Sequence, residues 1–285
     1  VLHVSVVEGI VERITPHGNK KTKDRVITRE FNQKVGQPFN KFLVRRSVEK
    51  VYNLGFFDDV NVRLTQGSTE EMVNIEVDVL EHKTGTITLG AGYSDADGFV
   101  GIVEVGEENL RGTGDKVKVH WEFGGTAGYK NYSVSYLRPW IDRKGTSLGV
   151  TYYNQLNEYT DYNEKGQSKA TYDRKSNGFN ISLGRQTGEF TRDYVTLEHR
   201  KDTYVWDNKD SSGFRYDTDV NGGPGSGYRW NNEGYKFAST GYIKHNFGTT
   251  NSISWQKVFD SRDNVYEPTR GKRLSSTLQW GGHGL

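Results

Sequence analysis

The sequence predicts a small α+β domain followed by an antiparallel β-barrel that crosses a membrane. Up to residue 82 the apolar residues mix two-residue spacing with three- and four-residue spacing, whereas after residue 82 only the two-residue spacing of strands remains. The composition agrees with this reading, because 13% of residues are aromatic and 34 glycines stand against 5 prolines. Such a chain is rich in strands and turns.

The first domain is expected to have the element order strand, helix, helix, strand, strand. Its elements are predicted at residues 9–19, 21–32, 38–55, 58–64 and 72–81. In the first helix Val26, Ile27 and Phe31 share one face. In the second helix Asn40 stands at the N-cap position and Gly55 at the stop. This element order alone fits any small α+β domain.

The second part of the chain is expected to contain only strands. They are predicted at about residues 84–94, 98–109, 115–124, 130–138, 146–157, 177–185, 190–203, 250–259 and 272–281. In the first of them one face carries Ile87, Leu89, Ala91 and Tyr93, and the other carries Thr86, Thr88, Gly90 and Gly92. A membrane strand of about 9–11 residues needs an apolar side chain only at every second position, so this pattern is sufficient to cross a bilayer.

A β-sandwich would also show this alternation, but two features favour the membrane barrel. The connections at 110–114, 139–145, 186–189 and 260–271 are short, whereas those at 158–176 and 204–249 are long. Outer-membrane barrels combine short turns on one side with long loops on the other. Aromatic residues also stand near the predicted strand ends, as in an interfacial girdle: Tyr93, Phe99, Trp121, Phe123, Tyr132, Trp140 and Trp280. The apolar faces are therefore expected to contact lipid and the polar faces a water-filled lumen.

Several functional classes are disfavoured by the sequence. A net charge of +2 gives no general case for nucleic-acid binding, and without cysteine there is no disulfide framework or thiol nucleophile. Gly90-Ala91-Gly92 is not followed by a helix, so it is not a nucleotide loop. No metal site, cofactor site or nucleophile–base–acid set is recognisable, and we expect a protein that is not an enzyme.

The remaining polar motifs are interpreted as structural. Residues 20–23, KKTK, are expected to form a solvated turn, and the adjacent Glu107 and Glu108 a solvated strand end. His120 is expected to line the lumen. A network of ion pairs within a turn is predicted for Asp260, Arg262 and Asp263.

Several segments of the sequence also resemble the sequences of a known family. Residues 8–31, EGIVERITPHGNKKTKDRVITREF, and 52–64, YNLGFFDDVNVRL, are similar to the last POTRA domain of the BamA family, the outer-membrane assembly factors of diderm bacteria. Residues 84–124, TGTITLGAGYSDADGFVGIVEVGEENLRGTGDKVKVHWEFG, resemble its first three barrel strands. Further likeness lies at 135–153 and 260–280, whereas 204–249 resembles nothing familiar.

The resemblance implies three segments. Residues 1–8 would be the last strand of a preceding POTRA domain, 9–82 a POTRA domain in the periplasm, and 83–285 the N-terminal part of a barrel in the bacterial outer membrane. The family's barrel has sixteen strands and about nine are predicted here, so a portion of a longer protein is expected. The competing interpretation is a dwarf relative that closes with about eight strands or pairs with a second copy.

The function implied by the resemblance is the insertion and folding of outer-membrane β-barrel proteins. The implied partners are nascent outer-membrane proteins, accessory lipoproteins on the periplasmic side and outer-membrane lipid. Client chains would add to two exposed strand edges by β-augmentation. The first barrel strand offers Thr86, Ile87, Thr88, Leu89, Gly90, Ala91 and Gly92, and the POTRA edge strand offers Asp59, Val60, Asn61, Val62 and Arg63.

Other outer-membrane functions stay open at this point. A two-partner secretion pore would act on one exported partner, and an assembly factor specialised for autotransporters or lipid would use the same modules. A passive porin would lack the mixed domain at 9–82. Residues 204–249 are expected to form an external loop with local packing around Tyr235, Phe237, Tyr242 and Ile243, or else an added pair of strands.

Overall fold

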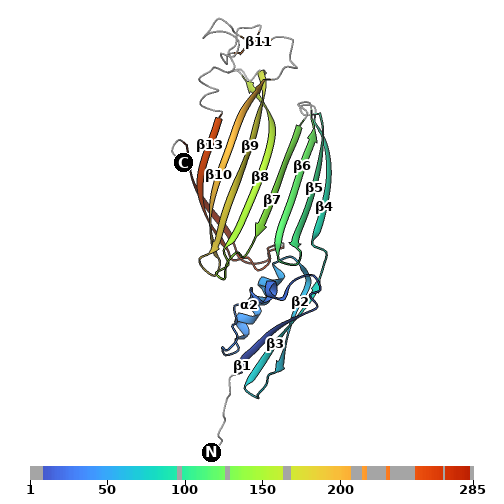
Figure 1. Cartoon of the computed structure of the whole chain (residues 1–285), viewed down its shortest axis with the longest axis vertical. Coiled ribbons are helices and arrows are strands. Elements are labelled where there is room, and N and C mark those ends of the chain that lie inside the picture. Colours follow the sequence, from blue (N-terminus) through green and yellow to red (C-terminus); the bar gives the residue numbers. More distant parts are fainter. Residues whose placement is uncertain are drawn as a thin grey trace, which may run out of the picture.

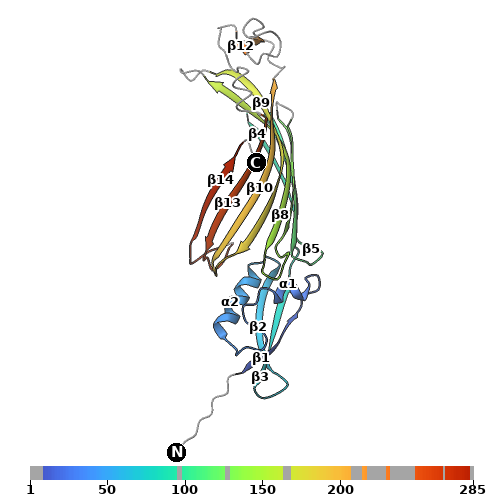
Figure 2. The same ribbon diagram turned by 60° about the vertical axis from the view of Figure 1, so that its left-hand side comes forward.

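The structure is a computed structural model of the whole chain. It describes residues 9–94, 98–125, 129–162, 168–206, 214–216, 229–231, 248–265 and 267–282. The α+β domain lies beneath one end of a large curved sheet, as both views show (Figure 1, Figure 2). No helix in the described part of the chain is long and apolar enough to span a membrane. The expected strand at residues 1–8 lies outside the described residues.

The α+β domain has the predicted element order. Its elements are β1 (Ile10–His17), α1 (Asp24–Thr28), α2 (Lys41–Tyr52), β2 (Phe57–Gln66) and β3 (Met72–Glu81). The three strands form a sheet in the order β1-β3-β2, in which β1 runs parallel and β2 antiparallel to the central β3. The Asn40 side chain caps α2 by accepting from the backbone N–H groups of Phe42 and Leu43, at 2.9 and 3.2 Å.

The hydrophobic core of the described residues lies entirely in this domain. Val26 and Ile27 of α1, Val51 of α2, and Ile75 and Val77 of β3 are all fully buried. The helices therefore cover one face of the small sheet with the apolar stripe that their spacing predicts. α1 is shorter than the predicted segment 21–32, yet its expected face is correct, because Phe31 in the following turn is also buried.

The large sheet contains nine antiparallel strands in chain order, from β4 at one edge to β14 at the other. The strands are β4 (Gly85–Ser94), β5 (Gly98–Leu110), β6 (Asp115–Gly124), β7 (Tyr129–Arg138), β8 (Ser147–Tyr162), β9 (Ser168–Gln186), β10 (Thr191–Trp206), β13 (Gly248–Asp260) and β14 (Arg273–Gly281). All nine predicted strands are present. The sheet curves like part of a barrel wall (Figure 2).

The two faces of the large sheet differ in chemistry, as the alternation predicts. One cross-strand row runs from Ile87 on β4 to Phe179 on β9 through Val105, Val119, Val134 and Tyr152. The neighbouring row on the opposite face contains Thr88, Glu104, His120, Ser133 and Tyr153. We call these the apolar face and the polar face of the sheet. His120 contacts Glu104 at 3.3 Å, which places it on the polar face as expected.

One expectation about loops needs correction, and the alternative stated for a second loop agrees with the structure. Residues 158–176 are not a long loop, because β8 and β9 extend into this segment and pair as far as Tyr162 and Ser168. The alternation of apolar and polar residues fades there, so no strand was predicted for this segment. Within 204–249 the structure describes a small sheet of β11 (Phe214–Tyr216) and β12 (Arg229–Asn231), in line with the strand-pair alternative. Tyr235, Phe237, Tyr242 and Ile243 lie outside the described residues.

Candidate functional site: two strand edges and the pocket between them

The first candidate edge is β4. Among the described residues it pairs with β5 alone, from Gly85 opposite Glu107 to Ser94 opposite Gly98. Its apolar side chains are open to the surroundings, with Ile87 and Leu89 each 74% exposed. All seven residues predicted to engage a client, 86–92, lie on this strand.

The second candidate edge is β2, which carries the predicted residues 59–63. It pairs with β3 on one side, and the described residues place no strand on its other side. The opposite edge of the small sheet, β1, differs, because the segment 36–39 covers its beginning. The N–H of Val11 donates to the Gln37 carbonyl at 3.0 Å, and the Val11 carbonyl accepts from Gly36 at 2.8 Å. The small sheet is therefore more open at β2 than at the start of β1.

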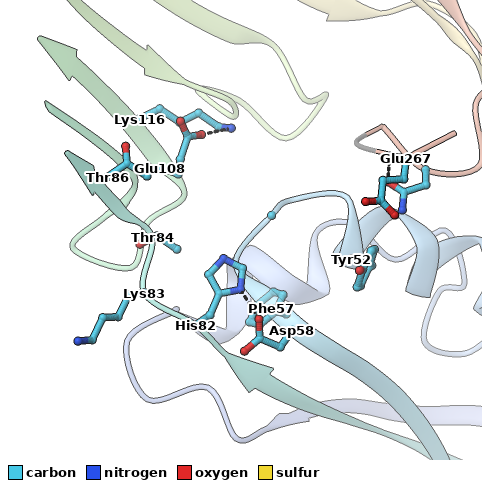
Figure 3. A pocket seen from close by; sticks show the side chains of 12 residues that line it. Tyr52, Phe57, Asp58, His82, Lys83, Thr84, Thr86, Glu108, Lys116 and Glu267 are labelled. Atoms are coloured by element: carbon cyan, nitrogen blue, oxygen red, sulfur yellow. Dashed lines mark hydrogen bonds and ion pairs between the residues drawn. The ribbon is translucent and has the colours of Figure 1, made fainter. Parts of the chain in front are cut away.

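A pocket of about 690 Å³ connects the beginnings of these two edges, and we call it the junction pocket (Figure 3). Phe57 and Asp58 contribute the start of β2, and Thr86 contributes the start of β4. His82, in the linker 82–84, lies 3.0 Å from the Asp58 carboxylate through Nδ1. This volume lies within the usual range for sites that accept small molecules or side chains.

The base of β4 is fixed to the α+β domain by a polar cluster. Thr84 is buried and donates to the Glu107 carboxylate. Lys21 Nζ lies 3.0 Å from both Thr84 Oγ1 and Glu107 Oε2. The amide of Asn109 donates to Thr22 Oγ1 at 2.7 Å. The expectation of a solvated 20–23 turn holds for its three exposed lysines, but it is wrong for Thr22, which is buried. The expectation of a merely solvated Glu107 is also wrong, because its carboxylate binds Thr84 and Lys21 across the domain boundary.

The carboxylate of Glu81 organises the same turn from below. It accepts from the backbone N–H groups of Lys20, Lys21 and Thr22, at 2.9, 2.9 and 2.6 Å. Burial acts to raise the pKa of Glu81, but the hydrogen bonds from Thr22, Lys21 and Lys20 outweigh it and hold this pKa below its usual value. A charged Glu81 therefore stabilises the turn that carries Lys21 to the base of β4.

The contact between α1 and the barrel turns is unusually close. The N–H of Lys23 donates to the Gly112 carbonyl at 2.9 Å. Gly112 has a φ of +71°, and a Cβ at this position would lie 1.8 Å from the Lys21 carbonyl oxygen. Only glycine fits there, because both the backbone conformation and the space exclude a side chain.

A third element of the junction is the turn 261–272. Arg262 pairs with Asp260 at 2.8 Å, and Asp263 accepts from the backbone N–H groups of Thr269 and Arg270, both at 3.1 Å. The predicted ion pair is confirmed for Asp260 and Arg262, whereas Asp263 holds the turn through backbone N–H groups rather than through an ion pair. The same turn reaches the α+β domain, where the N–H of Val265 donates to Asn53 Oδ1 at 3.4 Å.

The polar face carries charged groups in contact with one another. Glu104 lies 2.8 Å from Lys118, and the buried Asp202 lies 2.7 Å from Arg174 and 3.0 Å from Arg200. No group of three or more His, Cys, Asp or Glu side chains within the described ranges is arranged to hold a metal ion. In the described residues the arrangement offers open main-chain edges and a charged polar face.

Sequence reasoning located both edge strands but missed the junction. Its members, Lys21, Thr84 and Glu107, are separated by up to 86 residues, so no local spacing could reveal their contact. The available signal was the length of the connection, because β3 ends at Glu81 and β4 begins at Gly85. Three linking residues force the two domains into contact.

Comparisons with known proteins agree with the fold. The Omp85 superfamily domain matches residues 109–285, and the POTRA family, described as surface antigen variable number repeat, matches residues 9–82. A curated relative, the outer membrane protein assembly factor BamA of Neisseria meningitidis serogroup B, is 30% identical over 194 residues, covering 67% of this chain and 24% of the relative.

Two solved structures share the architecture. BamA from Haemophilus ducreyi lacking POTRA domains 1–3 superimposes with a TM-score of 0.60 at 21% identity, over 97% of this chain and 49% of that one. CdiB from Acinetobacter baumannii gives a TM-score of 0.57 at 15% identity, over 96% of this chain and 46% of that one. This chain therefore spans about a quarter of the curated relative's length and about half of either solved structure.

Proposed function

Since this chain belongs to the Omp85 superfamily, we propose that it takes part in inserting and folding β-barrel proteins in the bacterial outer membrane. The predicted resemblance to the BamA family is confirmed, and the chain is an outer-membrane protein with its POTRA domain in the periplasm. The family consists of assembly and transport proteins rather than known enzymes. The proposed clients are nascent outer-membrane proteins, and accessory lipoproteins stay a prediction.

The observation that carries the proposal is the pair of open strand edges joined by the junction pocket. An extended client segment adds to an edge through main-chain hydrogen bonds, which depend little on its sequence. Such binding suits a machine with many clients and requires no nucleotide. The edge of β2 would receive the client in the periplasm, and the edge of β4 would receive it in the membrane.

The junction pocket gives these two edges a common entrance. It contains Phe57 and Asp58 at the start of β2, and Thr86 at the start of β4. A client strand that leaves β2 would therefore meet the lower end of β4 through this pocket. Its side chains would occupy the pocket during that transfer.

The glycines of β4 support its use as the working edge. Gly90 and Gly92 have no side chain to pack, and glycine loses more backbone entropy on ordering than other residues. The alternative is that these glycines only relieve crowding in a curved sheet, as they do at barrel corners. Space does not force glycine there, because a Cβ at Gly90 would meet Ile102 at an ordinary 3.7 Å and one at Gly92 would meet nothing.

Site-specific crosslinking in the complete protein tests the proposal. A cysteine at Thr88 on β4 should form a disulfide with a cysteine in the terminal strand of a stalled client, and so should a cysteine at Asn61 on β2. The matched control is Ser133→Cys on β7, which lies on the same polar face in a strand paired on both sides. Equal crosslinking at Thr88 and Ser133 would contradict an edge mechanism. A series of unrelated clients separates general assembly from secretion of one partner.

A further inference from the structure

A second pocket lies where α1 meets the β5–β6 and β7–β8 turns, and we call it the rim pocket. Its volume is about 790 Å³. Both domains supply its basic side chains, with Arg25, Arg29 and Lys34 from the POTRA domain and Arg138 and Arg143 from the barrel. With two carboxylates also present, its lining has a net charge of +3.

The two carboxylates of the rim pocket are already engaged. Asp142 accepts from the backbone N–H groups of Lys144 and Thr146, at 2.8 and 3.0 Å, and thereby holds the β7–β8 turn. Asp115 accepts from the hydroxyl of Tyr136 at 2.9 Å and lies 3.7 Å from Arg138. They are therefore poorly placed to neutralise the cations at the mouth of the pocket.

The basic side chains at the mouth of the pocket are free to bind an anion. Arg25 and Arg143 are exposed, and no carboxylate of the described residues forms an ion pair with either. Arg29 forms the buried floor, where its guanidinium lies 5.6 Å from the centre of the Trp140 ring and its Nε lies 3.4 Å from the Glu30 carboxylate. Arg29 Nη2 is buried and donates to no acceptor in the described structure. A buried donor without a partner is rare in folded proteins and calls for an acceptor.

The rim pocket opens on the outer, apolar face of the barrel. Side chains alternate along a strand, so Tyr136 and Arg138 project on the same face as Val134. Arg138 pairs in register with Leu148, and Leu148 with Leu183, in an apolar row. The pocket thus lies where the apolar belt ends on the periplasmic side.

The β7–β8 turn has the character of a membrane interface at this level. Trp140 donates from Nε1 to Glu30 at 3.1 Å, which fixes the indole at the rim. Ile141 beside it is 46% exposed. Tryptophan is enriched at the boundary between hydrocarbon and headgroups, so the headgroups of the periplasmic leaflet would stand at the height of the pocket.

We propose that the rim pocket binds the phosphate headgroup of an anionic phospholipid from the periplasmic leaflet, with the acyl chains lying against the apolar face above it. Arg29 and Arg138 contact the phosphate, because guanidinium groups bind phosphate oxygens in a bidentate manner. Arg25, Lys34 and Arg143 supply the surrounding positive field. Basic pockets at the membrane surface recognise anionic headgroups in this way. The lipid would bridge the POTRA domain and the barrel.

The test uses the complete protein in lipid nanodiscs and counts bound lipid by native mass spectrometry. Discs of phosphatidylcholine are compared with discs that also contain phosphatidylglycerol. The variant Arg25→Gln/Arg143→Gln removes two exposed cations from the mouth of the pocket. The control variant Arg13→Gln/Arg45→Gln removes two exposed cations elsewhere on the POTRA domain. Electrophoretic mobility with and without heating verifies that each barrel is folded.

We expect the wild-type protein to retain phosphatidylglycerol in preference to phosphatidylcholine, and the control variant to do the same. The double variant should bind phosphatidylglycerol about 20-fold more weakly, because each basic residue near an anionic surface contributes a factor of about five. Equal retention by wild type and double variant would overturn the proposal. Displacement of the lipid by millimolar inorganic phosphate would also overturn it, since that result would assign the pocket to a free anion.

Discussion

Strands of the POTRA domain and of the barrel sheet share a two-residue alternation of apolar and polar side chains, but the apolar side chains are buried in the first and exposed in the second. On β3 the side chains of Ile75 and Val77 are fully buried beneath helices, whereas on β4 the side chains of Ile87 and Leu89 are 74% exposed. The POTRA domain excludes water with its own core, whereas the apolar face of the sheet has no protein cover in the described residues, and we propose that lipid covers it. Apolar alternation therefore predicts a strand, and the surrounding elements decide what covers it.

The largest effect is expected from a cavity in the POTRA core. Ile75→Ala should lower the free energy of unfolding of this domain by about 2–5 kcal/mol, because the surrounding side chains close the space only in part. Ile181→Ala on the apolar face of β9 should cost much less, since lipid chains fill the vacancy. Hydrogen exchange of the backbone amides of β3 and β9 in lipid measures both. Similar losses at the two positions would refute the contrast.

A charge on the apolar face should have a somewhat smaller effect. Val119→Arg should destabilise the barrel by about 2–4 kcal/mol if the residue lies near the centre of the bilayer. Lys118→Arg, one residue away on the polar face, should change little, because it keeps the contact with Glu104. Urea titration of folding into vesicles compares the two variants. Equal costs would mean that the two faces are assigned the wrong way round.

Loss of a helix cap acts on the POTRA domain alone. Asn40→Ala should lower its stability by about 1 kcal/mol, because the N–H groups of Phe42 and Leu43 lose their acceptor. Asn40→Asp preserves the acceptor and should be close to neutral. Thermal unfolding followed by circular dichroism gives the difference. Loss of stability in both variants would indicate that Asn40 acts through another contact.

The smallest effect concerns pH. The pKa of Glu81 is lower in the folded protein than its ordinary value of 4.5, so its contribution is present above that value and lost as pH falls through the folded pKa. We expect less than about 1 kcal/mol, because solvent screens this partly exposed group. Acid titration of the wild-type protein and Glu81→Gln should show a smaller loss of stability with falling pH in the variant, because Asp78 also has a lowered pKa and titrates in both proteins. An unchanged acid profile in the variant would assign it to other carboxylates.

The sequence predicted the strands where one face is apolar and the other polar. It failed at 158–176, where β8 and β9 continue through a segment with few apolar residues and no regular alternation. A strand that leaves the bilayer no longer needs an apolar face, so the alternation that identifies it disappears. The additional length of β8 and β9 is seen only in the pairing of the two strands, which extends to Tyr162 opposite Ser168.

The candidate edges were predictable, but their surroundings were not. Residues 86–92 and 59–63 could be located because each segment forms a strand of its own. The contacts beside the junction and rim pockets join side chains from distant segments, such as Lys21 with Glu107 and Glu30 with Trp140. Such contacts arise from the packing of two domains, so they cannot be predicted from the periodicity of the apolar residues or from the composition.

The linker 82–84 also limits how the POTRA domain can move. Three extended residues span at most about 11 Å, so the domain cannot swing freely below the membrane. A larger rotation must break the contacts of Lys21 with Thr84 and Glu107, or pull on Gly85 itself. Any rotation of the POTRA domain therefore pivots at the base of β4. A force exerted by a client bound to the POTRA domain would therefore act directly on β4, without being transmitted through the other strands of the large sheet.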